Sequence, residues 1–133
     1  MKYLNNPCNI RKNNTIWLGQ IKSDKPFCEF DTLEHGLRAV FKILATYHSR
    51  GLVTIPDMIS HYAPPNENNT RSYINFVCNH CHYPRTSSVD LYDKTLMKTI
   101  VRYMCLIESS TAVSDSVLDS AYLSAFPKYK LPF

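Results

Sequence analysis

The segment Cys78-Asn79-His80-Cys81-His82 has the spacing of half a metal site, because two cysteines in a CxxC arrangement can place two thiolates on one ion. Either histidine could be a third ligand, but a closed zinc site needs a fourth. The chain has no second CxxC and no HxxxH pattern. We therefore predict no metal and no other cofactor, and interpret this segment as a helix end with buried thiols and a capping histidine.

A cysteine and a histidine can also form a nucleophile pair that attacks a peptide amide. Cys8 or Cys28 with His35 would supply the pair, but no local pattern typical of cysteine peptidases accompanies them. The five cysteines are an odd number, so complete internal pairing cannot occur. Cys8 and Cys28 flank a short predicted hairpin, which would permit a disulfide between them in an oxidising compartment. Buried thiols are the alternative.

Two glutamates, Glu34 and Glu67, are the candidates for general acid and base chemistry. Glu34 begins a predicted helix, whose macrodipole stabilises a charged carboxylate and so suits a base or an electrostatic stabiliser. Glu67 lies in a proline-bounded polar loop with Asn68 and Thr70. Each glutamate also has a structural interpretation, since Glu34 fits a capping box opened by Asp31, and the loop at Glu67 can cap the next helix.

A β-rich start and a helical remainder must position these side chains. Over residues 5–31, turn pairs and β-prone runs predict two or three short strands. From Asp31 the apolar residues recur at helical spacing. The predicted helices run from Asp31 to about His48, from Thr54 to before Pro64, from the loop at 66–70 through Val77, from Ser87 or Ser88 through Ile107, and from near Ser114 through Tyr122. We expect an α+β, mainly helical fold with a small N-terminal β-hairpin lobe.

Length and composition exclude several classes of protein. A chain of 133 residues fits one domain, and 44% hydrophobic against 20% charged residues excludes disorder for most of it. No apolar run approaches the ~20 residues of a membrane helix, and the N-terminus lacks the apolar region of a secretory signal. We therefore expect no membrane span. The net charge of +4 is spread along the chain and forms no basic stripe, so we also expect no nucleic-acid partner. Attraction to an acidic polymer is an equally good interpretation of the charge.

Fixed spacings in the first 77 residues resemble small proteins of phages, prophages and Bacteroidetes that are labelled virion structural proteins. The matching segments are Asn5-Asn6-Pro7-Cys8-Asn9-Ile10-Arg11, Trp17-x-Gly19, Phe27-x-x-Phe30, Glu34-His35-Gly36-Leu37-Arg38-Ala39 and Tyr62-Ala63-Pro64-Pro65-x-Glu67-Asn68-x-Thr70-x-x-Tyr73. Cys8 replaces the glycine of that pattern. Within a single domain of residues 1–133, the motif-bearing core is 5–77, and 78–133 is a C-terminal helical extension without a recognised counterpart.

The order of these segments along the chain also resembles, more faintly, the order in lysozyme-like glucosaminidases. Those enzymes cleave peptidoglycan, the sugar and peptide polymer of the bacterial wall. Those enzymes carry an Asn-Asn-rich turn into a β-lobe, a WxG-like step, an aromatic-x-x-aromatic strand and a later Tyr-Ala segment. The similarity implies a lysozyme-like helical domain and peptidoglycan as its partner. Those enzymes place their principal acid on a helix before the Asn-Asn turn, where this chain has only Met1-Lys2-Tyr3-Leu4. An acid would have to come from elsewhere.

On this similarity we predict a glycan-strand hydrolase or lytic transglycosylase. Glu34 and Glu67 would face one groove as the catalytic carboxylates, and Thr70 would position water or substrate. The predicted substrate-binding residues are Trp17, Arg38, Tyr62, Asn68 and Tyr73. Trp17 has the alternative of a core residue, and Arg38, one turn after Glu34, would orient a carboxylate.

A non-catalytic phage virion structural or cell-wall-binding protein is the alternative function. A hydrolase clears a cell-wall substrate, whereas a structural subunit leaves the wall intact. The family context implies a protein made in the cytoplasm that acts at the wall or periplasm after delivery, or that stays in the virion. Delivery by a virion or by a contractile, type VI secretion machine would fit, with an immunity protein as a further partner if the chain is an antibacterial toxin.

Overall fold

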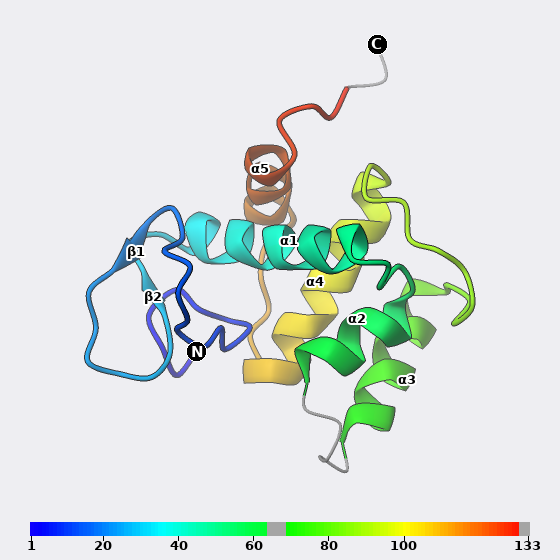
Figure 1. The fold of residues 1–133 in the computed structure, drawn as a ribbon, viewed down its shortest axis with the longest axis horizontal. Helices are drawn as coiled ribbons and strands as arrows, with labels where there is room; N and C mark the ends of the chain where they lie inside the picture. Colours follow the sequence, from blue (N-terminus) through cyan, green and yellow to red (C-terminus); the bar gives the residue numbers. More distant parts are fainter. Residues whose placement is uncertain (64–68, 131–133) are drawn as a thin grey trace.

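A helical body with a small β-lobe at one end makes up the computed structural model, which describes residues 1–63 and 69–130 (Figure 1). The prediction of a mainly helical fold with a small antiparallel sheet is confirmed. The described elements are β1 (Gln20–Ile21), β2 (Glu29–Phe30), α1 (Leu33–Ser49), α2 (Ile55–Tyr62), α3 (Thr70–Cys81), α4 (Lys94–Ser109) and α5 (Asp115–Ala125). In the described ranges no helix has the length and apolar character that crossing a bilayer requires.

Helix α1 is the centre of the core. Its apolar stripe, Leu37, Val40, Phe41 and Leu44, is fully buried, as helical spacing predicts. The N-cap of the helix is Thr32, whose hydroxyl accepts a hydrogen bond from the His35 N–H at 3.1 Å. The predicted capping box opened by Asp31 is therefore wrong.

Helices α2 and α3 lie at the far end of α1, and α4 and α5 pack across it (Figure 1). The Phe41 ring meets the Tyr122 ring edge-on at 5.5 Å. Tyr122 is fully buried and donates its hydroxyl hydrogen to the Leu91 carbonyl at 2.7 Å. This bond ties α5 to the irregular segment that precedes α4.

Helix α4 begins later than predicted, at Lys94 instead of Ser87 or Ser88. Two aspartates explain the difference, because each accepts a nearby backbone N–H. The Asp90 carboxylate accepts from Tyr92, and the Asp93 carboxylate accepts from Leu96 at 3.0 Å as the true N-cap.

The β-lobe is held by the Asn5-Asn6 turn more than by its strands. β1 and β2 are two residues each, pair antiparallel with Gln20 opposite Phe30, and are extended by a single bridge between Arg11 and Phe27. Asn6 is fully buried. Its amide donates to the carbonyls of Ile10 and Cys28 at 3.0 and 2.8 Å, and its side-chain oxygen accepts from the Ile10 N–H at 2.9 Å.

Two glycines let the lobe approach α1. A Cβ on Gly36 would lie 1.8 Å from the Asn5 carbonyl oxygen, and a Cβ on Gly19, which has a φ of +80°, would lie 2.2 Å from the His35 ring. Asp31 meets the same ring, its carboxylate lying 2.6 Å from His35 Nδ1. The first turn of α1 therefore packs against the lobe.

Gly36→Ala is expected to lower the free energy of unfolding by about 2 kcal/mol, because the new methyl group must displace backbone. Alanine's better helix propensity offsets only part of that cost. Gly51→Asn is the control. Gly51 has a φ of +87° and nothing within 4 Å of an added Cβ, and asparagine tolerates that conformation. Urea unfolding of both variants checks the prediction, and equal losses would contradict it.

Candidate functional site

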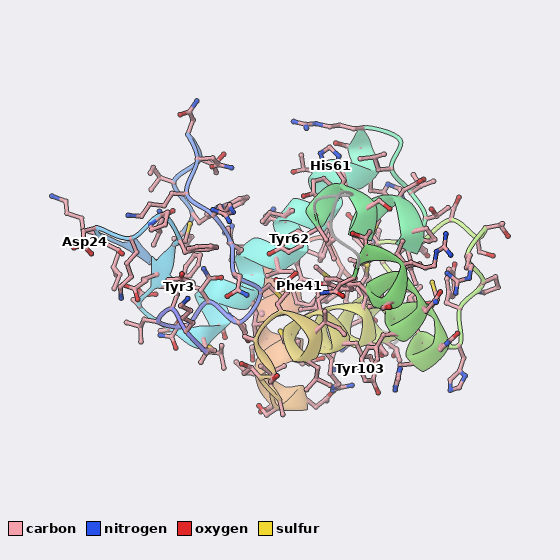
Figure 2. The ribbon with its side chains drawn as sticks, turned by 90° about the horizontal axis from the view of Figure 1, so that it is seen from below. Tyr3, Asp24, Phe41, His61, Tyr62 and Tyr103 are labelled. Carbon is pink, nitrogen blue, oxygen red and sulfur yellow. The ribbon has the colours of Figure 1, made fainter. Side chains whose placement is uncertain are left out.

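A groove of about 810 Å³ lies between the lobe and the helices. Tyr3 on the lobe and Tyr62 at the end of α2 come from its two sides (Figure 2). The described lining residues are Lys2, Tyr3, Asn9, Ile10, Arg11, Asn13, Thr15, Trp17 and Phe27 from the lobe, and Ile43, Thr46, Tyr47, Arg50, Tyr62, Ala63, Asn69, Thr70, Tyr73, Ile107, Glu108 and Ser109 from the helical body. Its lining combines aromatic rings with hydrogen-bonding groups, as ligand sites do.

Four of the predicted site residues line this groove together: Trp17, Tyr62, Thr70 and Tyr73. They come from the lobe, from the end of α2 and from α3. Glu67 and Asn68, which were also predicted to belong to the site, lie outside the described residues.

Glu34 and Arg38 do not line the groove. The groove takes its α1 residues from Ile43 onwards, which places Glu34 about 13 Å further back along the helix axis. Because the first turn of α1 packs against the lobe, the prediction that Glu34 faces the groove is wrong.

Arg38 lines a smaller hollow of about 530 Å³, which shares Trp17 with the groove. Its Nε is buried without a hydrogen-bond partner, and it forms no ion pair with Glu34 in the described part of the chain. In this structure Arg38 therefore does not orient the Glu34 carboxylate.

Glu108, in the last turn of α4, is a groove carboxylate that sequence reasoning missed. It is the acidic residue among the described groove-lining residues. The Asn9 side-chain amide donates to the Glu108 backbone carbonyl at 2.9 Å and to its Oε1 at 3.3 Å. The sequence signal was present, since Glu108 is an acid that directly follows the apolar stripe of a predicted helix. What the sequence lacked was a link between residues 99 positions apart.

Tyr73 places a second polar atom beside Glu108. The Tyr73 side chain is only 4% exposed, and its hydroxyl lies buried next to Glu108. Burial first, and then the neighbouring Cys8 and Glu108, raise the pKa of Tyr73 well above its ordinary value. The hydroxyl therefore stays protonated as a buried group beside Glu108.

Tyr62 has a structural role at the same place. Its hydroxyl donates to the Cys8 carbonyl, which fixes the end of α2 to the lobe. Burial raises the pKa of Tyr62 well above its ordinary value, so this donor also keeps its proton.

The lobe side of the groove is cationic. Lys2 and Arg11 line it, Arg50 faces them from the end of α1, and Glu108 is the described counter-charge. The Arg11 guanidinium lies 4.6 Å from the centre of the Phe27 ring. The Tyr3 ring stacks on the same Phe27 ring, with the ring centres 4.3 Å apart. The stack holds the Arg11 charge in place at the groove.

The cysteines form neither the predicted disulfide nor a nucleophile pair. All five are free thiols, so Cys8 and Cys28 are not bridged. His35 pairs with Asp31. The Cys8 thiol instead contacts Cys105, and this hydrogen bond and burial raise the pKa of Cys8 well above its ordinary value. A protonated, buried thiol is a poor nucleophile.

The CxxC segment ends α3. Cys78 is buried, and His82 caps the helix in the left-handed conformation with a φ of 49°. Within residues 1–63 and 69–130, no group of three His, Cys, Asp or Glu side chains is arranged to hold a metal ion.

Comparison with known proteins links the chain to phages. No protein-family model matches it. Over 92 residues it is 40% identical to a phage protein, and the match covers 65% of this chain and 58% of that protein. The phage protein is Protein P5 of Pseudoalteromonas phage PM2. The chain thus spans less than two thirds of that relative's length, and the phage part of the predicted resemblance is supported.

Proposed function

We propose that the groove binds a glycan strand of peptidoglycan and that the protein cleaves it as a hydrolase or lytic transglycosylase, with Glu108 as the general acid. The observation that carries this proposal is the contact between Glu108 and Asn9 at the groove. The similar glucosaminidases bring their acid from a helix that leads into the Asn-Asn turn. Here the last turn of α4 brings a glutamate to the end of that same turn, although it comes from the other end of the chain.

The position of Glu108 suits proton donation. Negative charge is disfavoured near the C-terminal end of a helix, where the carbonyl dipoles point outward. A glycosidase acid must be protonated when substrate binds, so that it can protonate the leaving oxygen. Glu67 remains the candidate for the second carboxylate. Trp17 and Tyr62 would stack on sugar rings, and Thr70 would bind sugar hydroxyls or position water. The buried Tyr73 hydroxyl would support the Glu108 side chain.

Release of soluble muropeptides from purified cell walls tests this proposal. We expect release by the wild-type protein, and a cleared zone in a gel that contains cell wall. Absence of release across acidic to neutral pH, by protein that still sediments with the wall, would contradict catalysis.

That negative result would favour the second candidate, a non-catalytic phage virion or wall-binding component. The similarity to a phage protein favours this candidate, and co-purification with phage particles would support it. Both candidate functions imply a protein that acts at the bacterial wall after delivery or that stays in a virion. An immunity protein would be a partner only if the hydrolase is an antibacterial toxin.

The cationic residues predict a preference for wall material that carries carboxylates. Arg11→Gln combined with Arg50→Gln is expected to weaken binding to cell walls roughly three- to tenfold, because exposed charge pairs each contribute up to about 1 kcal/mol. The loss should shrink at high salt, where such pairs are screened. Co-sedimentation with cell walls at two salt concentrations measures it.

Lys128→Gln is the control, since Lys128 is exposed and does not line the groove. Chitin, an uncharged glycan, should bind the wild type and the double variant equally. If the double variant loses equal affinity for chitin and cell wall, the charges do not recognise carboxylates.

A further inference from the structure

Three consecutive lobe residues dock on the C-terminal end of α4. The Ser109 hydroxyl donates to the Pro7 carbonyl at 2.7 Å, and the Asn9 amide donates to the Glu108 carbonyl at 2.9 Å. Between these bonds, the Cys8 and Cys105 Sγ atoms lie 3.6 Å apart. We refer to residues 7–9 and 105–109 as the lobe–α4 joint.

We propose that Cys8 and Cys105 are the site of an intramolecular disulfide that cross-links the lobe–α4 joint when the chain folds in an oxidising compartment. The two thiols lose two electrons and two protons and form one S–S bond. An external disulfide, of a dithiol oxidase or of glutathione, accepts these two electrons and two protons and is reduced to two thiols. The inference does not depend on what the groove binds.

The geometry favours this pair. Forming the bond requires the sulfurs to approach from 3.6 Å to about 2.05 Å, a movement that side-chain rotation and a small adjustment of the lobe loop can supply. Both residues are fully buried, and their backbones are already held by hydrogen bonds on either side of the thiols. Cys8–Cys105 is the pair of thiols in Sγ contact, and Cys28, Cys78 and Cys81 make no such contact.

Burial determines when the bond can form. The high pKa of the Cys8 thiol leaves little thiolate in the folded protein, and thiolate is the species that attacks a disulfide. Oxidation after folding is therefore slow. During folding the thiols are accessible, and the docking of residues 7–9 on α4 brings them together. The disulfide would then be protected from reductants by the same burial.

Refolding of the reduced, denatured chain in a glutathione redox buffer tests the inference. We expect the Cys8–Cys105 cross-link to be the dominant disulfide in a peptide map of the alkylated product. Closing a loop of this length should raise the Tm of the oxidised protein by roughly 10 °C over the reduced protein. Dithiothreitol added during unfolding should abolish the difference.

Two matched variants separate this pair from the other thiols. Cys28→Ser should keep the cross-link and the difference in Tm between oxidised and reduced protein. Cys105→Ser should lose the cross-link and the difference in Tm. Its own stability does not affect this result, because the oxidised form of each variant is compared with the reduced form of the same variant. A dominant Cys78–Cys81 bridge, intermolecular dimers, or refolded wild-type protein with all five thiols free would overturn the inference.

Discussion

Glu108→Gln is expected to lower the rate of muropeptide release from cell walls by roughly a hundredfold to ten-thousandfold, the range that a general acid contributes. Glutamine has the shape of glutamate but cannot donate a carboxyl proton. Its side-chain oxygen can still accept from the Asn9 amide, which lies 3.3 Å from Glu108 Oε1. The fold and wall binding should therefore persist while catalysis is lost. Release is measured by chromatography of the soluble fragments.

Glu34→Gln is the matched control for this loss. Glu34 lies outside the groove, so its variant should release muropeptides at the wild-type rate. Glu67→Gln tests whether Glu67 is the second catalytic carboxylate, since its loss should then also lower the rate of muropeptide release. If Glu108→Gln retains the wild-type rate and Glu34→Gln does not, the assignment of the acid to α4 is wrong.

The second large effect concerns folding. Asn6→Ala is expected to lower the free energy of unfolding by about 3–5 kcal/mol. The substitution removes three buried hydrogen bonds and leaves the Ile10 N–H and the Cys28 carbonyl with fewer partners. These bonds tie the first turn of the chain to both halves of the lobe. Chemical denaturation followed by circular dichroism measures the loss.

Asn13→Ala provides the comparison. Asn13 also accepts a backbone hydrogen bond in the lobe, from Thr15, but this bond is exposed. Water replaces an exposed bond at little cost, so the variant should lose less than about 1 kcal/mol. Similar losses in the two variants would show that burial of Asn6 is not what stabilises the lobe.

Local patterns were sufficient to predict most of the fold. Helical spacing of apolar residues predicted α1, and the short β-prone runs predicted the antiparallel lobe. The errors occurred where polar side chains compete for a helix start. Both Asp31 and Thr32 can cap a helix, and only the pairing of Asp31 with His35 leaves Thr32 as the cap.

The candidate site was predicted in part, for a physical reason. Trp17, Tyr62, Thr70 and Tyr73 belong to segments with recognisable spacing, and they do meet in one groove. Glu108 could not be placed beside them, since no local pattern reports a contact made across almost the whole chain.

Several residues of the fixed-spacing pattern build the lobe and do not face the groove. Asn6 is a buried hydrogen-bonding centre, and Gly19 and Gly36 allow backbone or rings to approach where a Cβ would collide. Such a pattern identifies an architecture more directly than a reaction. The segment after residue 77, which has no counterpart in that pattern, contributes the carboxylate.

The docking of residues 7–9 on the end of α4 also sets an order for biosynthesis. The lobe leaves the ribosome before α4, and its partners at 105–109 are translated about a hundred codons later. Contacts so distant along the chain close late and slowly. Residues 7–9 must therefore wait, with their docking surface uncovered, until residues 105–109 have been made.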